Sequence, residues 1–308
     1  MSDLVEIFCL QLSLSVFCVY YLYYGLEFKE GFPMGIRLVA LDMDGTVLLD
    51  DHLTITPAVR TAMEKAVEQG VLVVPATGRV CDMLPSVFRE IGGIRYVINS
   101  NGASVRDMQE DCVLYTNLIP VETVQRILEV LEPYGLLIQI YCEGKIYTES
   151  RSLKRVNDLP FTAEFIENIR KTQIELDSFQ SLLEQHPEGV EKLNLAHVEP
   201  GLREKLWKQF EAMPGISVVS SAGSNIELNR KGASKGDALC HLCKLLQIDP
   251  AETMAIGDSG NDIEMLQFAG YSVVMENGTP EAKAVAKYRT ASNADDGVAR
   301  AIETYILQ

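Results

Sequence analysis

The feature that most limits how this chain can fold is a short apolar run that ends in two acids. Residues 38–41 have the character of a strand buried in a parallel sheet, and Asp42 and Asp44 follow directly. In open α/β sheets, ligands bind at the carboxyl ends of the strands, where these carboxylates stand. Two carboxylates so close repel each other, and oxygen ligands suit Mg²⁺, so the sequence predicts a magnesium site at this rim.

A second strand brings hydrogen-bond donors to the same rim. Thr56 and the proline after it are typical of a helix start, and residues 71–74 form the next apolar run. Strand, helix and strand at this spacing indicate a right-handed βαβ unit with a parallel sheet. The Thr77 hydroxyl and the Gly78 N–H should therefore lie near Asp42, where they are suited to donate to a phosphoryl oxygen.

The segments around these strands are expected to complete the first half of the core. Residues 47–55 are polar in the middle and are predicted to form a small hairpin flap over the rim. A helix is predicted over residues 85–91, and a strand over residues 96–99 leads to Asn101. Residues 105–115 are predicted as a further hairpin.

Residues 118–228 differ in character from the segments on either side. Their helical and strand patterns indicate an α+β insert with an antiparallel sheet. Strands are predicted at 136–141, 145–148, 192–198, 216–221 and 225–228, helices at 123–131 and 202–213, and residues 150–190 are charged and helical in pattern. The predicted order along the chain is therefore core, insert, core.

Beyond the insert, two polar motifs return to the core. Lys235 stands at a predicted helix start, in the segment Lys-Gly-Ala-Ser-Lys-Gly. Asp258, Asn261 and Asp262 follow an apolar strand predicted over residues 253–256. A parallel strand at this point would bring these side chains to the same rim as the first two acids.

Taken in order, these motifs resemble those of the haloacid dehalogenase superfamily, subclass IIB, the Cof-like phosphatases. The matching segments are Asp42-Met43-Asp44-Gly45-Thr46, Asn101-Gly102-Ala103, Lys231 to Gly236 and Gly257 to Asp262. Glu276-Asn277-Gly278 departs from the Gly-Asn-Ala of most Cof-like proteins. The resemblance extends over nearly everything from Ile36 onward. It implies an α/β fold, with a Rossmann-like parallel-sheet core at 36–117 and 229–308 and an inserted α+β cap at 118–228.

The resemblance also implies a reaction and a role for each motif. It implies hydrolysis of small phosphate monoesters, such as sugar phosphates, through an aspartyl-phosphate, with Asp42 as nucleophile and Asp44 as general acid and then base. Mg²⁺ is expected on Asp42, the Asp44 backbone carbonyl and Asp258, with Asp262 holding a metal-bound water or Lys235. The phosphoryl group or the substrate is expected to contact Lys235, Thr77, Gly78, Arg79, Asn101 and Asn261.

Two other functions are compatible with the same motifs. A phosphomutase of the same subclass would use the same chemistry and rebind its phosphorylated product. A non-catalytic sugar-phosphate sensor is the alternative outside enzymes. The presence of both Asp42 and Asp44 argues against the sensor, because a sensor needs neither a nucleophile nor an acid.

Composition bounds the partners of the chain. Its 308 residues suffice for two modest domains, and a net charge of −16 argues against nucleic acid or an anionic membrane surface as a partner. Seven irregularly spaced cysteines favour the cytoplasm over a disulfide framework. Cys240 and Cys243 form a C-x-x-C without a second pair at zinc-ligand spacing, so they are interpreted as ordinary helix cysteines. A small phosphorylated metabolite is the expected partner of a monomer or homodimer.

Residues 1–35 are predicted to be an apolar N-terminal extension or a membrane segment, and residues 1–33 are the part that would be foreign to this fold. Ile7 to Leu26 contains no charged residue and is long enough to span a bilayer, so it is either an apolar N-terminal extension or a membrane segment. Lys29 and Arg37 would then keep the enzyme domain in the cytoplasm. Asp3 and Glu6 argue against a signal peptide. We favour an extension that precedes a natural start at Met34.

Overall fold

The computed structural model describes residues 35–153, 156–157, 163–221 and 223–307. The chain divides into two compact units, Met1–Gly35 and Ile36–Gln308, and the second is described here. The predicted N-terminal extension or membrane segment lies outside the described residues. Within the described ranges, every helix is too short or too polar to cross a bilayer.

The helices and strands follow one another in three groups along the chain. The first comprises β1 (Leu38–Leu41), α2 (Pro57–Glu68), β2 (Leu72–Pro75), α3 (Val87–Glu90), β3 (Tyr96–Asn99), β4 (Ser104–Asp107) and β5 (Cys112–Thr116). The second comprises α4 (Val121–Leu131), β6 (Ile138–Cys142), β7 (Lys145–Glu149), α5 (Ser150–Leu153), α6 (Ala163–Thr172), β8 (Gln173–Leu176), α7 (Phe179–Gln185), β9 (Lys192–Leu195), α8 (Pro200–Glu211), β10 (Ile216–Val219) and β11 (Ile226–Arg230). The third comprises α9 (Lys235–Leu246), β12 (Thr253–Gly257), α10 (Ile263–Phe268), β13 (Tyr271–Val274), α11 (Pro280–Val285), β14 (Tyr288–Arg289) and α12 (Gly297–Tyr305).

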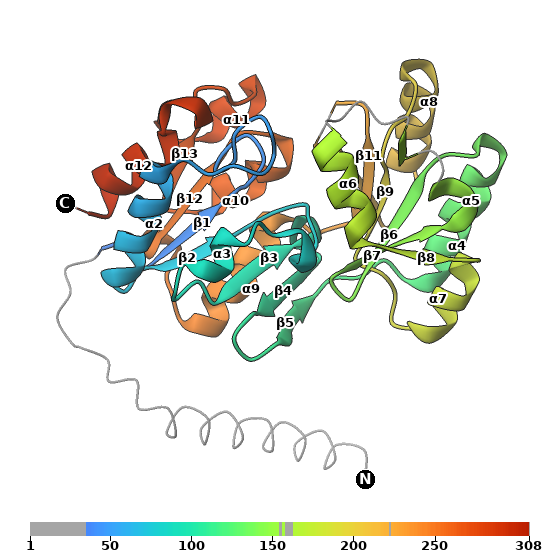
Figure 1. The fold of residues 1–308 in the computed structure, drawn as a ribbon, viewed down its shortest axis with the longest axis horizontal. Coiled ribbons are helices and arrows are strands. Elements are labelled where there is room, and N and C mark those ends of the chain that lie inside the picture. Colours follow the sequence, from blue (N-terminus) through green and yellow to red (C-terminus); the bar gives the residue numbers. More distant parts are fainter. Residues whose placement is uncertain (1–34, 154–155, 158–162, 222, 308) are drawn as a thin grey trace, which may run out of the picture. The chain divides into compact units, whose positions relative to one another are not determined.

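The first and third groups share a parallel five-stranded sheet in the order β14-β13-β12-β1-β2 (Figure 1). In this sheet Leu38 of β1 lies opposite Leu72 of β2 on one side and Thr253 of β12 on the other. The strand order changes direction at β1, because the chain adds β2 on one side of it and β12 on the other. Such a switch point is where open α/β sheets bind ligands, and Asp42 follows directly after β1.

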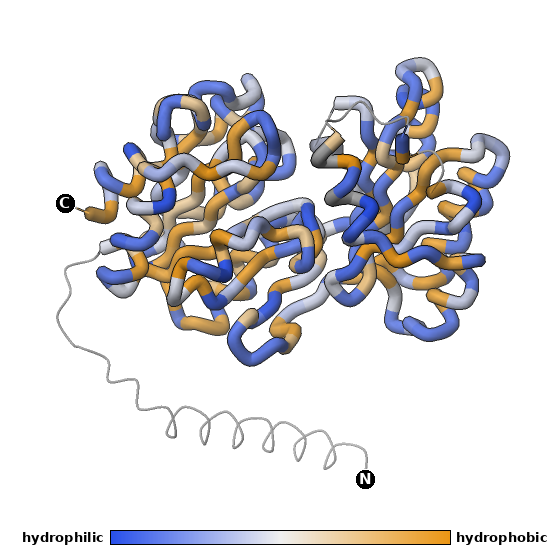
Figure 2. Tube along the Cα trace, in the orientation of Figure 1, coloured by the Kyte–Doolittle hydropathy of each residue, from blue (hydrophilic) through white to orange (hydrophobic). Residues whose placement is uncertain are grey.

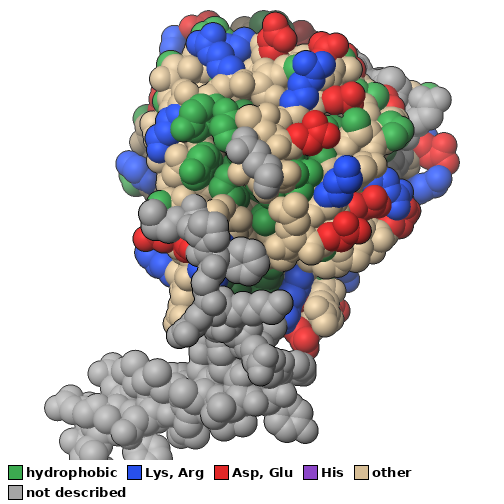
Figure 3. Space-filling view, turned by 90° about the vertical axis from the view of Figure 1, so that its left-hand side faces the viewer, with side chains coloured by type: hydrophobic (Ala, Val, Ile, Leu, Met, Phe, Trp, Pro, Cys, Tyr) green, Lys and Arg blue, Asp and Glu red, His purple; other side chains and the backbone are tan. Residues whose placement is uncertain are grey.

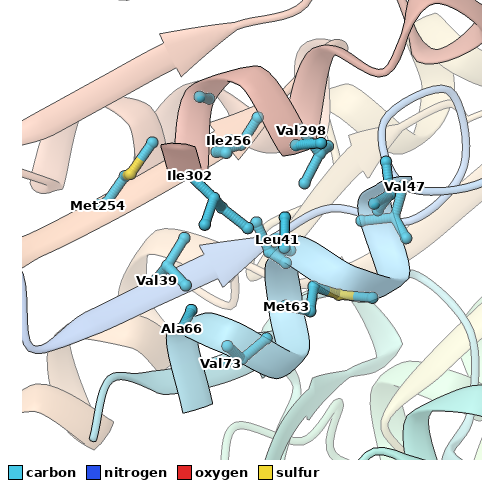
Figure 4. Close-up of a cluster of buried hydrophobic side chains, with 14 of the residues drawn as sticks. Val39, Leu41, Val47, Met63, Ala66, Val73, Met254, Ile256, Val298 and Ile302 are labelled. Carbon is cyan, nitrogen blue, oxygen red and sulfur yellow. The ribbon is translucent and has the colours of Figure 1, made fainter. Parts of the chain in front are cut away.

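Helices cover both faces of this sheet, as the unbroken apolar runs predict. Val39 and Leu41 point to one face and pack with side chains of α2 and α12, including Met63 and Ile302 (Figure 4). The intervening Leu38 and Ala40 point to the other face and pack against α9, α10 and α11. In Figure 2 the central strands are correspondingly orange, for hydrophobic residues. The α/β fold class with a parallel-sheet core is confirmed.

A second, three-stranded sheet has the order β3-β4-β5 and is antiparallel throughout. It includes the predicted hairpin of residues 105–115, and its first strand meets β2 at a single parallel bridge, Ala76 to Ile98. This bridge places the end of β3 beside the end of β2, so the loop that contains Asn101 lies next to the core sheet. The predicted helix at 85–91 is shorter than expected and consists of α3 alone.

The predicted hairpin flap over residues 47–55 is wrong. This segment forms successive turns, and one of them positions His52 at a positive φ of 59°. The Asp51 carboxylate accepts hydrogen bonds from Leu53 N at 2.9 Å and Thr54 N at 2.8 Å. A side chain that captures backbone N–H groups locally competes with strand pairing, so the segment folds as turns.

The second group forms a six-stranded sheet in the order β10-β11-β9-β6-β7-β8, within residues 118–230 (Figure 1). All neighbours are antiparallel except β7 and β8, which are parallel, so the expected purely antiparallel sheet is a mixed one. β8 itself lies within residues 150–190, which were expected to be helical. Its sequence Gln-Ile-Glu-Leu alternates polar and apolar residues, but the strand has only four residues and pairs with β7 alone, at the edge of the sheet.

The surface carries charge of both signs. On the face drawn in Figure 3, acidic, basic and hydrophobic side chains are interspersed. Large hydrophobic side chains are exposed at Leu53, Val113, Ile174 and Tyr288. These residues lie on separate segments of the chain, and isolated apolar side chains are ordinary on protein surfaces.

Candidate active site

A buried ion-pair cluster lies where β1, α9 and β12 end or begin. The Lys235 ammonium is fully buried and lies 2.5 Å from Asp42 Oδ1 and 2.7 Å from Asp262 Oδ1. Although burial opposes it, Asp262 and Asp42 together raise the pKa of Lys235. Lys235 is therefore charged in the folded protein and neutralises part of the negative charge around it.

Asp258 adds a third carboxylate to this cluster. Oxygens of Asp42, Asp258 and Asp262 all lie within 4.8 Å of one another. Burial and the neighbouring Asp262 raise the pKa of Asp258 to about 6, and the same two causes raise that of Asp42 well above its usual range. The Lys235 ammonium pairs with Asp42 and Asp262, and the raised pKa values of Asp42 and Asp258 reflect burial together with the crowding of negative charge.

Two further observations indicate that this cluster is suited to bind a divalent metal ion. Asp42 Oδ2 is buried and accepts no hydrogen bond from any residue that the structure describes. All three groups offer hard carboxylate oxygens, which is the donor chemistry of Mg²⁺ sites. Asp262 also accepts hydrogen bonds from the backbone N–H groups of Asp258 and Ser259, both at 2.9 Å. Asp262 therefore orients the loop that presents Asp258.

The local sequence explains how Lys235 reaches Asp42. Ser234 is the N-cap of α9 and accepts a hydrogen bond from Asp237 N at 3.1 Å, so the helix starts at Lys235. Gly102 has a φ of 90°, and a Cβ there would lie 2.0 Å from the Ser234 carbonyl oxygen. Only glycine allows this close approach, which packs the loop after β3 against the start of α9.

Asp44 also lines the cavity, but it is held by different partners from those of Asp42. Arg79 Nε donates to Asp44 Oδ2 at 2.9 Å, its Nη2 lies 2.5 Å from Oδ1, and His52 Nδ1 lies 2.8 Å from Oδ1. Burial raises the pKa of Asp44, but the hydrogen bond from His52 and the charge of Arg79 outweigh it and lower the pKa. The same hydrogen bond to Asp44 raises the pKa of His52. In this arrangement Asp44 is ionised.

The loop after β2 carries Thr77 and Gly78, and Gly78 lines the cavity whereas Thr77 is not among the lining residues. Thr77 is buried, its backbone N–H donates to Ile98 O at 2.8 Å, and its hydroxyl accepts from Arg79 N at 3.1 Å. Asn101 has a φ of 58° and donates from its own N–H to Thr77 O at 3.0 Å. The loops after β2 and β3 are thus joined through backbone hydrogen bonds.

Asn101 and Asn261 contact each other, although they belong to distant motifs. Asn261 Nδ2 donates to Asn101 Oδ1 at 3.2 Å, and Ser259 Oγ donates to Asn261 Oδ1 at 2.7 Å. Both asparagines therefore bond to protein partners here. Asn261 lines the cavity, whereas Asn101 is behind its wall.

The cavity above Asp42 is about 160 Å³ in volume, and residues of the insert form much of its lining. One face of the insert's sheet supplies them. In β6, β9 and β11, Gln139 lies opposite Asn194, Asn194 opposite Glu227, and Tyr141 opposite Lys192. The alternate residues, such as Leu193, point to the other face and pack in the insert's own hydrophobic core.

Sequence reasoning did not identify this polar face. The signal was present in the strict alternation of Ile-Gln-Ile-Tyr (138–141), Lys-Leu-Asn-Leu (192–195) and Ile-Glu-Leu-Asn (226–229). Alternation alone is also the pattern of a sheet with one face in water. Here the polar face is buried, since Gln139, Asn194, Glu227 and Lys192 are all less than a tenth exposed.

The family model of haloacid dehalogenase-like hydrolases matches residues 39–302. The chain belongs to that family. The match begins at β1 and ends in α12, so it includes both the core sheet and the insert.

Relatives of this haloacid dehalogenase-like hydrolase include named phosphatases. It is 32% identical to the phosphatase YwpJ of Bacillus subtilis over 86% of this chain and 98% of that one. It is 30% identical to the 5-amino-6-(5-phospho-D-ribitylamino)uracil phosphatase YbjI of Escherichia coli, over 88% and 96%. A solved haloacid dehalogenase-like hydrolase from B. subtilis superposes with a TM-score of 0.75 and 30% identity, covering 87% of this chain and 99% of that one. Family, relatives and fold agree on a phosphoric monoester hydrolase.

One segment in which this hydrolase departs from the Cof-like pattern still supports the site. Asn277, in the sequence Glu-Asn-Gly, donates from Nδ2 to Gly45 O at 2.7 Å, and its Oδ1 accepts from Asn293 N at 3.1 Å. Asn293 in turn donates to Leu48 O at 2.9 Å. Two asparagines from the end of the chain therefore hold the turn that follows Asp44.

Proposed function

We propose that this hydrolase is a Mg²⁺-dependent phosphatase that cleaves small phosphate monoesters through an aspartyl-phosphate. The observation that carries the proposal is a cluster at one end of a cavity, formed by the buried Asp42, Asp262 and Lys235 and the half-buried Asp258. Uncatalysed hydrolysis of phosphate monoesters is extremely slow, so such a site must stabilise a large transferring charge. A buried cluster that combines a nucleophile, a fixed ammonium and ligands for a divalent cation is suited to that task.

Asp42 is the proposed nucleophile. Lys235 lies 2.5 Å from Asp42 Oδ1 and holds the carboxylate in one orientation. One carboxylate oxygen is proposed to attack phosphorus, and the other would bind the metal ion. The new bond joins Asp42 to phosphorus, and the bond from phosphorus to the ester oxygen breaks. The leaving alkoxide takes a proton, and water then cleaves the acyl phosphate to release inorganic phosphate.

Asp44 is the proposed proton donor and later the base for water. Its hydrogen bonds to Arg79 and His52 keep it ionised in this structure. We propose that the anionic phosphoryl group, when it arrives, competes for the Arg79 guanidinium. Release from Arg79 would raise the pKa of Asp44 and allow it to carry the proton that the leaving group needs.

A metal ion would be held by Asp42 and Asp258, with the Asp44 backbone carbonyl as a further oxygen ligand. Asp262 would support the site by holding Lys235 and the loop that carries Asp258. When bound, Mg²⁺ supplies Lewis-acid stabilisation of the charge on the transferring phosphoryl group. Thr77 and the Gly78 N–H are proposed to donate to the phosphoryl oxygens, together with Lys235. Asn261 is proposed as a further contact, and Asn101 supports it from behind through the 3.2 Å hydrogen bond.

We propose that residues 118–228 act as a cap that selects the leaving group, and that residues 36–117 and 229–308 form the catalytic core. The wall that the insert contributes is rich in amides, with Asn194 donating to Gln139 at 2.8 Å. Amide groups both donate and accept, which suits the hydroxyl groups of a sugar or polyol phosphate. The small cavity favours a compact leaving group. The free cysteines of the described residues support a reducing, cytoplasmic location, with the chain as a monomer or homodimer.

A panel of phosphate esters tests the proposed reaction. Purified protein with Mg²⁺ should release inorganic phosphate from sugar phosphates and from an aryl phosphate, and a chelator should abolish the release. Restoring Mg²⁺ should return it. Phosphate release that persists in chelator would overturn the metal assignment. Isomerised sugar phosphate without net phosphate release would favour a phosphomutase.

Asp44→Asn should separate the two half-reactions. An aryl phosphate has a good leaving group and needs little protonation, so the variant should still form the phosphoenzyme slowly. Attack by water lacks its base, so covalent phosphate should accumulate on Asp42. Mass spectrometry after an acid quench would detect it, and Asp42→Asn, which should show none, is the matched control. A variant that turns over like wild type would contradict the assigned role of Asp44.

Asn194→Ala should weaken recognition of the leaving group without harming the chemistry. Loss of one buried hydrogen-bonding amide should raise KM for a sugar phosphate about tenfold. An aryl phosphate, which has no hydroxyl groups to recognise, should be affected less than about twofold. Gln180→Ala, at an exposed position on α7, is the control. Equal losses on both substrates would count against a specificity role for the insert.

A further inference from the structure

The insert reaches the phosphoryl-binding loop through a buried lysine. Lys192 of β9 is 1% exposed, and its Nζ donates to the Gly78 carbonyl oxygen at 2.6 Å. The same ammonium lies 4.3 Å from the centre of the Tyr141 ring and 3.3 Å from Glu227 Oε1. A buried lysine is costly without partners, and here the ring, the carboxylate and a core carbonyl surround it.

The peptide group between Gly78 and Arg79 is thereby fixed at both ends. Its carbonyl accepts from Lys192, and its N–H, which belongs to Arg79, donates to the Thr77 hydroxyl at 3.1 Å. Rotation of this peptide would break the hydrogen bond to the Thr77 hydroxyl and would move the start of Arg79, which binds Asp44. A Cβ on Gly78 would lie 2.7 Å from Asn101 Oδ1, so a larger residue would displace the Asn101 side chain.

Glu227 connects the same ion pair to the loop after β12. Its Oε2 accepts from Asn101 Nδ2 at 2.5 Å, and Asn101 Oδ1 accepts from Asn261 Nδ2 at 3.2 Å. The pair of Lys192 and Glu227 is therefore bonded to the loop after β2 on one side and, through Asn101, to the loop that carries Asp258 on the other.

We propose that Lys192 is a positioning residue for the phosphoryl site, holding the Gly78–Arg79 peptide so that Thr77 and Arg79 face the phosphoryl group, with Glu227 holding Lys192 in place. This inference rests on the proposed function. It means that the insert contributes to catalysis itself as well as to the choice of leaving group. Small misplacements of a phosphoryl-binding loop are costly in rate, because the reaction depends on alignment.

The test separates stability from rate. Lys192→Met removes the donor to Gly78 but leaves the Glu227 carboxylate buried without its cation, so both kcat and the thermal midpoint should fall. In the double variant Lys192→Met/Glu227→Gln neither charge remains, so the midpoint should recover. The rate should stay about 10- to 100-fold below wild type on an aryl phosphate, because the Gly78 carbonyl still has no donor.

Two further variants complete the comparison. Lys192→Arg restores a donor and should recover kcat to within about tenfold of wild type. Glu227→Gln alone keeps the donor to Gly78 but removes the carboxylate that holds Lys192, so its kcat should lie between those of wild type and Lys192→Met. Lys205→Met, the same substitution at an exposed position on α8, is the control. Recovery of kcat together with the midpoint in the double variant would show that Lys192 is only structural, and would overturn the proposal.

A second measurement does not depend on turnover. Binding of inorganic phosphate, measured by calorimetry with Mg²⁺ present, should be about tenfold weaker in Lys192→Met and in the double variant than in wild type. If wild type cleaves no ester, the proposed function fails, whereas this comparison still tests Lys192. Equal phosphate affinity in all the variants would overturn the positioning role.

Discussion

Asp42→Asn is expected to reduce phosphate release at least about 10⁴-fold on every ester. The substitution removes the nucleophile and one metal ligand together, and an amide oxygen is a far weaker nucleophile than a carboxylate. It also removes the anionic partner 2.5 Å from Lys235. Steady-state phosphate release gives the rate, and mass spectrometry of acid-quenched protein should show no added phosphate.

Folding must be intact for this result to be interpreted. Asp42→Asn removes one of three crowded carboxylates, and the pKa values of two of them, Asp42 and Asp258, are raised. Lys235 keeps Asp262 as its partner at 2.7 Å, so the thermal midpoint of the variant should be at or above that of wild type. Asp177→Asn, an exposed position between β8 and α7, is the matched control and should have wild-type activity. Near-normal turnover by Asp42→Asn would show that the assignment of the whole site is wrong.

Lys235→Met is expected to cost both stability and activity. The ammonium is fully buried against Asp42 and Asp262, and removing one partner of a buried ion pair costs about 3–5 kcal/mol. For a domain of this size, such a loss corresponds to a fall of roughly 6 to 20 °C in the thermal midpoint. Mg²⁺ should restore part of this fall, because a cation bound to the folded state supplies the missing charge. Calorimetry with and without Mg²⁺ measures both effects.

The matched control is Lys244→Met, an exposed position on the same helix, α9. It should change the free energy of unfolding by less than about 0.5 kcal/mol. If Lys235→Met were as stable as this control, the carboxylates would not depend on the ammonium for neutralisation. If Mg²⁺ had no effect on its midpoint, the three carboxylates would not be the metal site.

The sequence predicted the core well because each of its motifs is local. The apolar run of residues 38–41 is typical of a buried strand, and the two acids that follow it are therefore expected at the end of that strand. The same reasoning placed Thr77 at its rim and Lys235 at its helix start. Each of these inferences needs only the hydrophobic pattern of a short segment and the rule that functional groups gather at the carboxyl ends of parallel strands.

The features that the sequence did not predict depend on contacts between distant segments. The bond from Lys192 to Gly78 joins residues 114 apart in sequence, and no local pattern distinguishes a buried polar face from a solvated one. His52 was placed in a hairpin because the capture of backbone N–H groups by Asp51 was not anticipated. β8 pairs with β7 alone, at the edge of the sheet. In each case a partner elsewhere, or a side-chain-to-backbone bond, overrode the intrinsic preference.

The position of β1 in the sheet has a consequence for how the chain is made. β1 leaves the ribosome early, but β12, its neighbour, is among the last strands to be synthesised. Thr46 and Asp258, which hydrogen-bond across this pair, are 212 residues apart. At ordinary rates of synthesis this delay is roughly 10 to 40 s, during which one edge of the central strand has no partner. The nascent chain must therefore keep a hydrophobic strand edge from aggregating until β12 arrives, which makes co-translational protection a requirement of this topology.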